Sequence, residues 1–347
     1  MNPDFIREAL RQVRYPGFSR DIVSFGLIKE VVCDPGHTTV RIEVQTRDPK
    51  VPEQIFHDCH AVLDALPDVG AVKVDISIKD APTTSADATG KSSIPGVKRI
   101  LAVASGKGGV GKSTVAANLS VALAATGAKV GLCDCDLYGP SVPQMFGSHE
   151  RPLANDQDEI IPIQAHGVRL MSMGFLLEGS SPVVVRGPMA TRYTQQFLRQ
   201  VAWGDLDYLI LDLPPGTGDI QLTIVQTVAV DGALIVTTPQ EVALIDARKG
   251  VAMFAKVNVP ILGMIENMAW FECDAGKKYH IFGEGGGVRE AEATGVPMLG
   301  RIPIDMVTRE RGDSGAPVAL LPPATNKVSA AFHELAARVM AAVPAAW

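Results

Sequence analysis

The chain has 347 residues, of which 46% are hydrophobic and 20% are charged, and it contains 33 glycines and 24 prolines. This composition indicates a folded, loop-rich α/β protein and excludes a disordered chain. The formal net charge of −6 disfavours general nucleic-acid binding, and no apolar run approaches the roughly 18 residues that a membrane helix needs.

The segment from Met1 to Glu8 is polar and partly acidic, unlike a secretory signal or a transit peptide. The five cysteines form an odd, sparse set, which argues against a disulfide framework. We therefore expect a cytoplasmic protein that has neither nucleic acid nor membrane as its partner.

Residues 1–80 are expected to form a small domain of helices and strands, of the α+β class. Alternating apolar residues predict strands, and apolar residues at helical spacing predict helices. In chain order we expect a helix at 5–13, strands at 27–33 and 40–44, a helix at 52–66 and a strand at 72–78. The predicted order is therefore α-β-β-α-β.

Residues 81–98 are small, polar and interrupted by proline and glycine, which predicts a flexible linker. The following domain, 99–347, alternates between strands and helices. Its strands are continuously apolar, as expected for a mostly parallel, doubly wound sheet covered by helices on both faces. We predict strands at 99–104, 129–134, 207–212, 232–237 and 260–266, and helices at 113–126, 188–202, 219–229, 241–256 and 328–343.

A glycine-rich octet between the strand at 99–104 and the helix at 113–126 fits G-x-x-x-x-G-K-[ST], the phosphate-binding loop. Its glycines let backbone N–H groups converge on an anion, and the helix N-terminus adds its own field. An ordinary glycine-rich turn is the alternative. We expect nucleoside triphosphate to be bound by Gly106, Lys107, Gly108, Gly109, Val110, Gly111, Lys112, Ser113 and Thr114.

Acidic residues end two further apolar strands, at the edge where α/β sheets place their ligands. In a phosphate loop, Lys112 reaches the β- and γ-phosphates and Ser113 binds Mg²⁺. Asp212 is the candidate for an outer-sphere Mg²⁺ partner, and Asp136 for orienting or deprotonating the attacking water. Aspartates also commonly cap turns. The chain order of loop and aspartates favours the catalytic interpretation.

The loop, with Lys107 as an additional lysine, resembles the deviant Walker A loop of the MinD, ParA, ArsA and nitrogenase iron protein group. The resemblance implies ATP as the nucleotide and a homodimer in which Lys107 of one subunit reaches the phosphates of the other. A cation supplied in this way makes hydrolysis depend on dimer closure. A lysine that only keeps the loop solvated is the alternative.

Further stretches resemble the Mrp/ApbC family of iron–sulfur cluster carriers. They are 134–143, 185–189, 212–219, 266–268, 281–283 and 300–303. The resemblance implies a slow ATPase that assembles or transfers clusters, with iron–sulfur assembly factors and recipient apoproteins as partners. It makes Asn267 a candidate for adenine recognition, because an amide both donates to and accepts from a base edge. Residues 1–80 resemble the SufT-like domain of other iron–sulfur assembly factors.

Members of that family usually carry Cys-x-x-Cys shortly after Glu-Asn-Met. Two such pairs at a dimer axis supply the four thiolates of a [4Fe–4S] cluster. Here the stretch reads Cys273-Asp274-Ala275-Gly276, so the second cysteine is absent. Cys273 is the candidate iron–sulfur ligand, and other protein ligands, a small thiol or a partner protein are left to supply the rest.

The remaining cysteines are weaker candidates. Cys59 and Cys133 lie at apolar positions and are expected in the core. Cys135 lies close to the nucleotide, and Cys33 precedes a turn where it is expected to be partly exposed. The alternative function is a MinD/ParA-like ATP-dependent dimerisation switch without a cluster. It calls for a basic or amphipathic end segment, which the Ala-rich run at 328–343 does not resemble.

Overall fold

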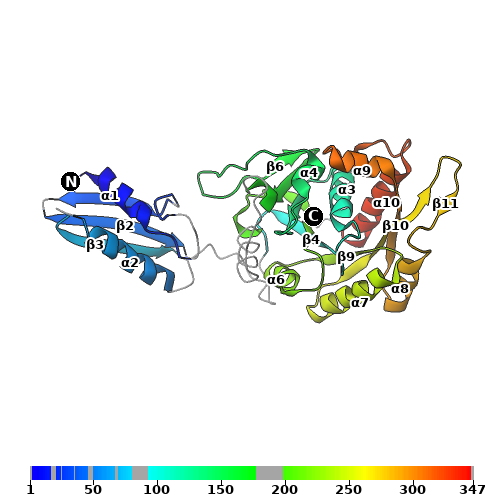
Figure 1. Ribbon diagram of the computed structural model, residues 1–347, viewed down its shortest axis with the longest axis horizontal. Helices are drawn as coiled ribbons and strands as arrows, with labels where there is room; N and C mark the ends of the chain where they lie inside the picture. Colours follow the sequence, from blue (N-terminus) through cyan, green and yellow to red (C-terminus); the bar gives the residue numbers. More distant parts are fainter. Residues whose placement is uncertain are drawn as a thin grey trace. The chain divides into compact units, whose positions relative to one another are not determined.

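A computed structural model describes residues 2–16, 21–24, 26–34, 36–45, 50–66, 69–79, 93–176 and 198–344. The chain divides into two compact units, Met1–Thr83 and Thr84–Trp347 (Figure 1). Each unit has its own hydrophobic core.

The first unit is a three-stranded sheet with helices on one face. Its elements are α1 (Pro3–Ala9), a 3₁₀ turn (Leu10–Gln12), β1 (Ile28–Asp34), β2 (His37–Gln45), α2 (Lys50–Leu63) and β3 (Ala71–Lys79). Strands β1 and β2 are antiparallel, and α2 forms the crossover that makes β2 and β3 parallel. Val40, Ile42 and Val44 alternate along β2 and pack against the helices. The predicted α-β-β-α-β order is confirmed.

The second unit contains a nine-stranded sheet. Its strands are β4 (Val97–Ala104), β5 (Val130–Asp134), β6 (Ile163–Ala165), β7 (Val168–Ser172), β8 (Leu206–Asp212), β9 (Gly232–Thr237), β10 (Ile261–Glu272), β11 (Lys278–Tyr279) and β12 (Met298–Ile304). The order is β11-β10-β9-β4-β8-β5-β7-β6, and β12 pairs with β10. Among the described strands of this sheet, only β6 and β11 run antiparallel to their neighbours.

Helices cover both faces of this sheet, as Figure 1 shows. They are α3 (Lys112–Ala124), α4 (Val142–Phe146), α6 (Asp219–Thr227), α7 (Glu241–Lys256), α8 (Gly286–Thr294), α9 (Met306–Asp313) and α10 (Lys327–Ala342). Along β4, Leu101 and Val103 pack in the core under α3 and α10, whereas Ile100, Ala102 and Ala104 pack in the core under α6 and α7. The predicted doubly wound α/β class is confirmed.

Some boundaries differ from the predictions. Strand β4 begins at Val97, inside the predicted linker, because Val97 pairs with Leu206 and Ile94 is already buried. Strand β10 runs past residue 266 to Glu272. The stretch at 185–189 and most of the predicted helix at 188–202 lie outside the described residues. No described helix is long and apolar enough to cross a membrane.

Candidate nucleotide site

The phosphate loop joins the carboxyl end of β4 to α3, and two of its glycines are needed because other elements press against them. Gly111 has φ +80° and caps α3 in the left-handed conformation. A Cβ at Gly111 would overlap the amide nitrogen of Asn267, and one at Gly106 would overlap the backbone oxygen of Asp246 in α7. The loop is therefore held between β10 and α7.

Lys112 and Asp212 form a buried ion pair at the ends of the loop and of β8. Lys112 Nζ donates to Asp212 Oδ1, and also to Ser113 Oγ at 3.2 Å. Lys112 is 6% exposed and Asp212 is fully buried. Burial raises the pKa of Asp212, although the positive charge of Lys112 opposes the shift.

The same carboxylate offers a free ligand position. Asp212 Oδ2 is buried and accepts no hydrogen bond from the described residues. A buried oxygen without a partner calls for an explanation, and a bound ion is one of the usual ones. Ser113 Oγ, bonded to the same Lys112 Nζ at 3.2 Å, is a second oxygen near this position, and oxygen atoms are the ligands that Mg²⁺ takes in proteins.

Asp134 and Asp136 order the turn after β5. Asp134 Oδ1 accepts from the Asp136 N–H at 3.1 Å, and its Oδ2 accepts from the Ser141 N–H and the Ser172 hydroxyl, each at 3.0 Å. Burial, with the nearby Asp212 charge, raises the pKa of Asp134 to about 7. Asp134 therefore has a structural role that the sequence analysis did not assign.

Asp136 itself is half-buried. Its Oδ1 accepts from the N–H groups of Tyr138 and Gly139, both at 3.2 Å. These contacts cap the turn, so Asp136 does have the alternative role that was raised for it, that of a turn-capping aspartate. Its predicted role toward water stays a prediction.

Asn267 connects β10 to the loop, since its Nδ2 donates to the Val110 carbonyl at 2.9 Å. One donor and the acceptor oxygen of this amide are left over for a ligand. Asn267 also lines a cavity of about 370 Å³, together with Gly111, Thr114, Met268, Pro303 and Asp305. That volume lies in the range of small-ligand pockets.

The β12–α9 side of this cavity, Pro303 to Thr308, was not among the predicted site residues. The feature that could have identified this side is a strand that ends beside β10 and leads into a helix whose N-terminus is capped by an aspartate. Asp305 Oδ2 accepts from the Thr308 N–H at 3.0 Å, which marks the N-terminus of α9. Ligands of α/β sheets bind outside the carboxyl ends of strands, which is where this turn lies.

Lys107 lies at the exposed tip of the loop. Its carbonyl accepts from the Ser105 hydroxyl at 3.0 Å. Lys112 is buried beneath the phosphate position, whereas Lys107 extends into solvent. The two lysines of the loop are thus placed for different tasks.

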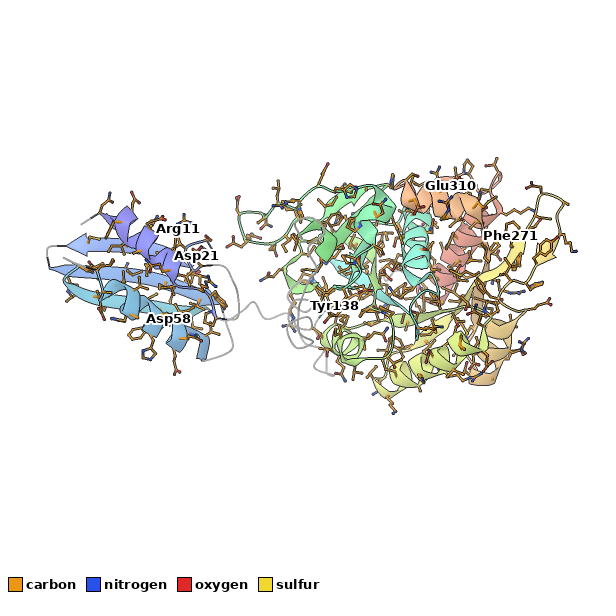
Figure 2. All side chains as sticks on the ribbon, in the orientation of Figure 1. Arg11, Asp21, Asp58, Tyr138, Phe271 and Glu310 are labelled. Carbon is orange, nitrogen blue, oxygen red and sulfur yellow. The ribbon has the colours of Figure 1, made fainter. Side chains whose placement is uncertain are left out.

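Cys273 directly follows β10, in the turn of a hairpin that projects from the edge of the sheet (Figure 1). Its N–H donates to the Lys277 carbonyl at 3.1 Å, and its own carbonyl accepts from the Gly276 N–H at 2.8 Å. The residue is half-buried. Figure 2 shows Phe271 on this hairpin, and its ring lies 6.5 Å from that of Tyr279.

Cys59, Cys133 and Cys33 follow their predicted burial, and Cys135, for which none was predicted, is buried as well. Cys59, Cys133 and Cys135 are buried, and Cys33 is half-buried. Burial raises the pKa of Cys59 to about 12. Contact with Cys133 and burial raise the pKa of the Cys135 thiol as well. Across the described ranges, no group of three or more His, Cys, Asp and Glu side chains is arranged to hold a metal ion.

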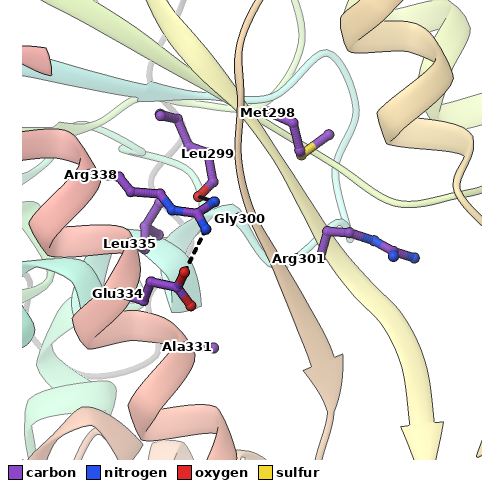
Figure 3. Close-up of a pocket in the computed structure, with 8 residues that line it drawn as sticks. All are labelled: Met298, Leu299, Gly300, Arg301, Ala331, Glu334, Leu335 and Arg338. Atoms are coloured by element: carbon purple, nitrogen blue, oxygen red, sulfur yellow. Dashed lines mark hydrogen bonds and ion pairs between the residues drawn. The ribbon is translucent and has the colours of Figure 1, made fainter.

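A smaller cavity of about 250 Å³ lies between β12 and α10 (Figure 3). Arg338 donates to the Leu299 carbonyl at 2.9 Å and pairs with Glu334. Arg301 points away from both of them and pairs with Glu266 instead. The charged groups around this cavity are therefore already paired, and they attach α10 and β10 to β12.

A phosphate loop whose lysine meets an aspartate from the neighbouring parallel strand defines a P-loop nucleoside triphosphatase. A family model described as "NUBPL iron-transfer P-loop NTPase" matches residues 96–340, and one described as "Iron-sulfur cluster assembly protein" matches residues 3–75. The chain belongs to the iron-transfer P-loop NTPase family.

Curated relatives carry the name iron-sulfur cluster carrier protein. The one from Pseudomonas fragi is 52% identical over 274 residues, which cover 77% of this chain and 93% of that protein. The one from Deinococcus radiodurans is 44% identical over 340 residues, which cover 97% and 94%. The resemblance to the cluster-carrier family is thereby confirmed.

Solved structures show the same fold. A nucleotide-binding protein in complex with ADP from Archaeoglobus fulgidus is 40% identical, with a TM-score of 0.57, over 63% of this chain and 87% of that one. The cell division ATPase MinD of Pyrococcus furiosus is 26% identical, with a TM-score of 0.54, over 70% and 99%.

Proposed function

We propose that this protein binds and hydrolyses ATP in order to assemble iron–sulfur clusters or transfer them to apoproteins. The observation that carries the proposal is strand β10, which contacts the phosphate loop through Asn267 and leads directly to Cys273. The named relatives support the same cargo. They do not favour the alternative, a dimerisation switch without a cluster.

ATP enters with its base and ribose in the 370 Å³ cavity and its phosphates on the loop. Backbone N–H groups of the loop and the α3 N-terminus bind the phosphate oxygens. Lys112 exchanges its bond with Asp212 for the β- and γ-phosphates, which frees that carboxylate. Ser113 and Asp212 would hold Mg²⁺ when it is bound, and the ion would neutralise charge on the phosphates.

Hydrolysis needs a positioned water and a further cation. Asp136, half-buried after β5, orients the water. Lys107, exposed at the tip of the loop, reaches the phosphates of a second copy in a homodimer. Because neither copy supplies this cation to its own nucleotide, ATP turnover depends on closure of the dimer.

The cluster is the cargo, and we propose the [4Fe–4S] type. Two copies of Cys273 supply two thiolates, whereas such a cluster takes four. Small thiols or cysteines of the recipient bind the remaining irons. A cluster held by the carrier at only half of its iron atoms is easier to hand over than one with four protein ligands.

The first unit, residues 1–80, is proposed to contact assembly factors or recipients, with residues 81–98 as a linker. The match of 3–75 to the assembly-protein model supports this role. The presence of free cysteines and the lack of described disulfides support a reducing compartment, and we propose the cytoplasm.

Anaerobic reconstitution with iron and sulfide tests the proposed function. The wild-type protein should gain iron and sulfide-to-iron absorbance, and Cys273→Ala should lose both. Cys33→Ala is the matched control, because Cys33 is also half-buried and should leave the iron content unchanged. Equal iron in wild type and Cys273→Ala would reject Cys273 as a ligand, and no iron in the wild type would reject the carrier function.

A further inference from the structure

Strand β10 changes conformation between its contact with the loop and Cys273. Met268, directly after Asn267, has φ +56°. A residue with a Cβ rarely adopts this left-handed conformation, and where it does, the surrounding structure enforces it. Such positions cluster at ligand sites and switch regions.

The pairing of β10 with β12 is interrupted at the same place. Asn267 pairs with Ile302, and the next pair is Phe271 with Ile304. Pro303 lies opposite the gap and has no N–H to donate, so a regular ladder cannot continue past it. The segment 268–270 therefore forms an irregular hinge between two regularly paired parts of the strand.

The part of β10 before this hinge is fixed. Glu266 is fully buried, and its carboxylate accepts from Arg301 Nε at 2.8 Å and from the Gly287 N–H at 2.6 Å. Asn267 is bound to Val110 in the loop. Any rearrangement of the strand must therefore occur at Met268 or beyond it.

The part after the hinge is held together as one body. Lys278 Nζ lies 4.5 Å from the centre of the Trp270 ring, a cation–π contact across the hairpin. Phe271 pairs with Tyr279 on the opposite strand. The strands of the hairpin are thus joined to each other, with Cys273 in their turn. On its other side the hairpin is attached through Arg301, 5.2 Å from the Trp270 ring, through Ile304 beside Phe271, and through Lys327, which pairs with Glu272, so these are the contacts that a change at Met268 would alter.

Asn267, directly before the hinge, and Met268, its first residue, both line the nucleotide cavity. We infer that Asn267 and Met268 are positioning residues that set the placement of the Cys273 hairpin according to whether a nucleotide occupies the cavity. The inference rests on the proposed function and adds the path by which nucleotide binding reaches the cysteine. A ligand shifts such an equilibrium only if it contacts the two states differently, and the left-handed turn of the strand at 268, beside the cavity, is the element that differs between them.

The alkylation rate of Cys273 reports the placement of the hairpin. Iodoacetamide labelling of the full-length protein is followed by peptide mass spectrometry, with and without the non-hydrolysable analogue AMP-PNP and Mg²⁺. We expect the rate at Cys273 to change about fivefold on adding the analogue, a ratio typical of a modest conformational bias. Labelling of half-buried Cys33 is the internal control and should not change.

Two variants separate positioning from folding. Met268→Gly makes many backbone conformations accessible and should reduce the nucleotide-dependent ratio to about one. Met268→Asn, which tolerates the left-handed conformation, should keep the wild-type ratio. Thermal unfolding and affinity for the analogue are measured for both, and each labelling ratio is taken at a saturating concentration of the analogue, so that a change in affinity does not enter the comparison.

The outcomes distinguish the inference from the function on which it rests. If the wild type binds AMP-PNP and the Cys273 rate stays constant, the inference is overturned while nucleotide binding stands. A full wild-type ratio in Met268→Gly also overturns it. Failure of the wild type to bind the analogue would overturn both proposals.

Discussion

At the scale of single residues, the phosphate loop contains two glycines with the same backbone conformation and different surroundings. Gly109 has φ +83° and Gly111 has φ +80°. No atom lies within 4 Å of the position that a Cβ would take at Gly109, whereas at Gly111 it would overlap the Asn267 amide. Backbone strain and the contact with β10 can therefore be separated by mutation.

Alanine at either glycine should cost about 1–3 kcal/mol of backbone strain. Gly111→Ala should in addition push Asn267 away from Val110 and weaken ADP binding by at least about tenfold relative to Gly109→Ala. Isothermal titration calorimetry measures the affinities and urea unfolding the stabilities. Equal affinities in the two variants would show that the Asn267 contact does not support the nucleotide site.

At the scale of elements, strands could be predicted where the apolar pattern is regular, either alternating as in β2 or continuous as in strands covered on both faces. In β8 the run Tyr208 to Leu211, and in β9 the run Ala233 to Val236, are continuously apolar, since helices cover both of their sides. Strand β12 escaped prediction because it carries Gly300, Arg301 and Pro303. Arg301 is needed by the buried Glu266, and Pro303 breaks the ladder with β10.

The residues of the candidate site also fall into a group that could be predicted from the sequence and a group that could not. The loop residues are a local motif, so their pattern is visible in the sequence alone. The Asn267–Val110 contact joins residues 157 positions apart and depends on the order of strands in the sheet. The cavity side from Pro303 to Thr308 depends on where β12 ends. Nothing local to these residues reveals their neighbours.

Glu266 is the point where β10, β12 and α8 are joined, through Arg301 and the Gly287 N–H. Glu266→Gln removes the charge while keeping the size of the side chain. We expect it to lower the free energy of unfolding by about 1.5–3 kcal/mol, the range for hydrogen bonds to charged groups. Urea denaturation measures the change.

The control is Glu334→Gln in α10, whose carboxylate pairs with Arg338 at the surface (Figure 3). An exposed pair of this spacing contributes about 0.3–0.5 kcal/mol, so this variant should unfold almost as the wild type does. If Glu266→Gln were equally neutral, the buried carboxylate would not be holding the three elements together.

At the scale of the whole molecule, one copy of the chain is incomplete for both of its proposed tasks. Lys107 is exposed at the tip of the phosphate loop, and Cys273 is a single half-buried thiol on a projecting hairpin. The proposed homodimer would complete both, since it would bring a second lysine to each nucleotide and a second thiolate to the cluster. Hydrolysis and cluster binding should therefore share a dependence on dimer formation.

Lys107→Ala tests this dependence directly. Because Lys107 is exposed and the buried Lys112–Asp212 pair stays intact, the variant should unfold at the wild-type temperature and bind ATP with unchanged affinity. Its kcat should fall by about 10³-fold, the lower range for a cation supplied in trans.

Mixing Lys107→Ala with an Asp136→Ala variant should restore part of the activity, since a mixed dimer contains one nucleotide with both groups intact. Lys256→Ala, another exposed lysine, is the control and should hydrolyse ATP normally. Normal turnover by Lys107→Ala, or no gain on mixing, would show that each copy hydrolyses its own nucleotide unaided.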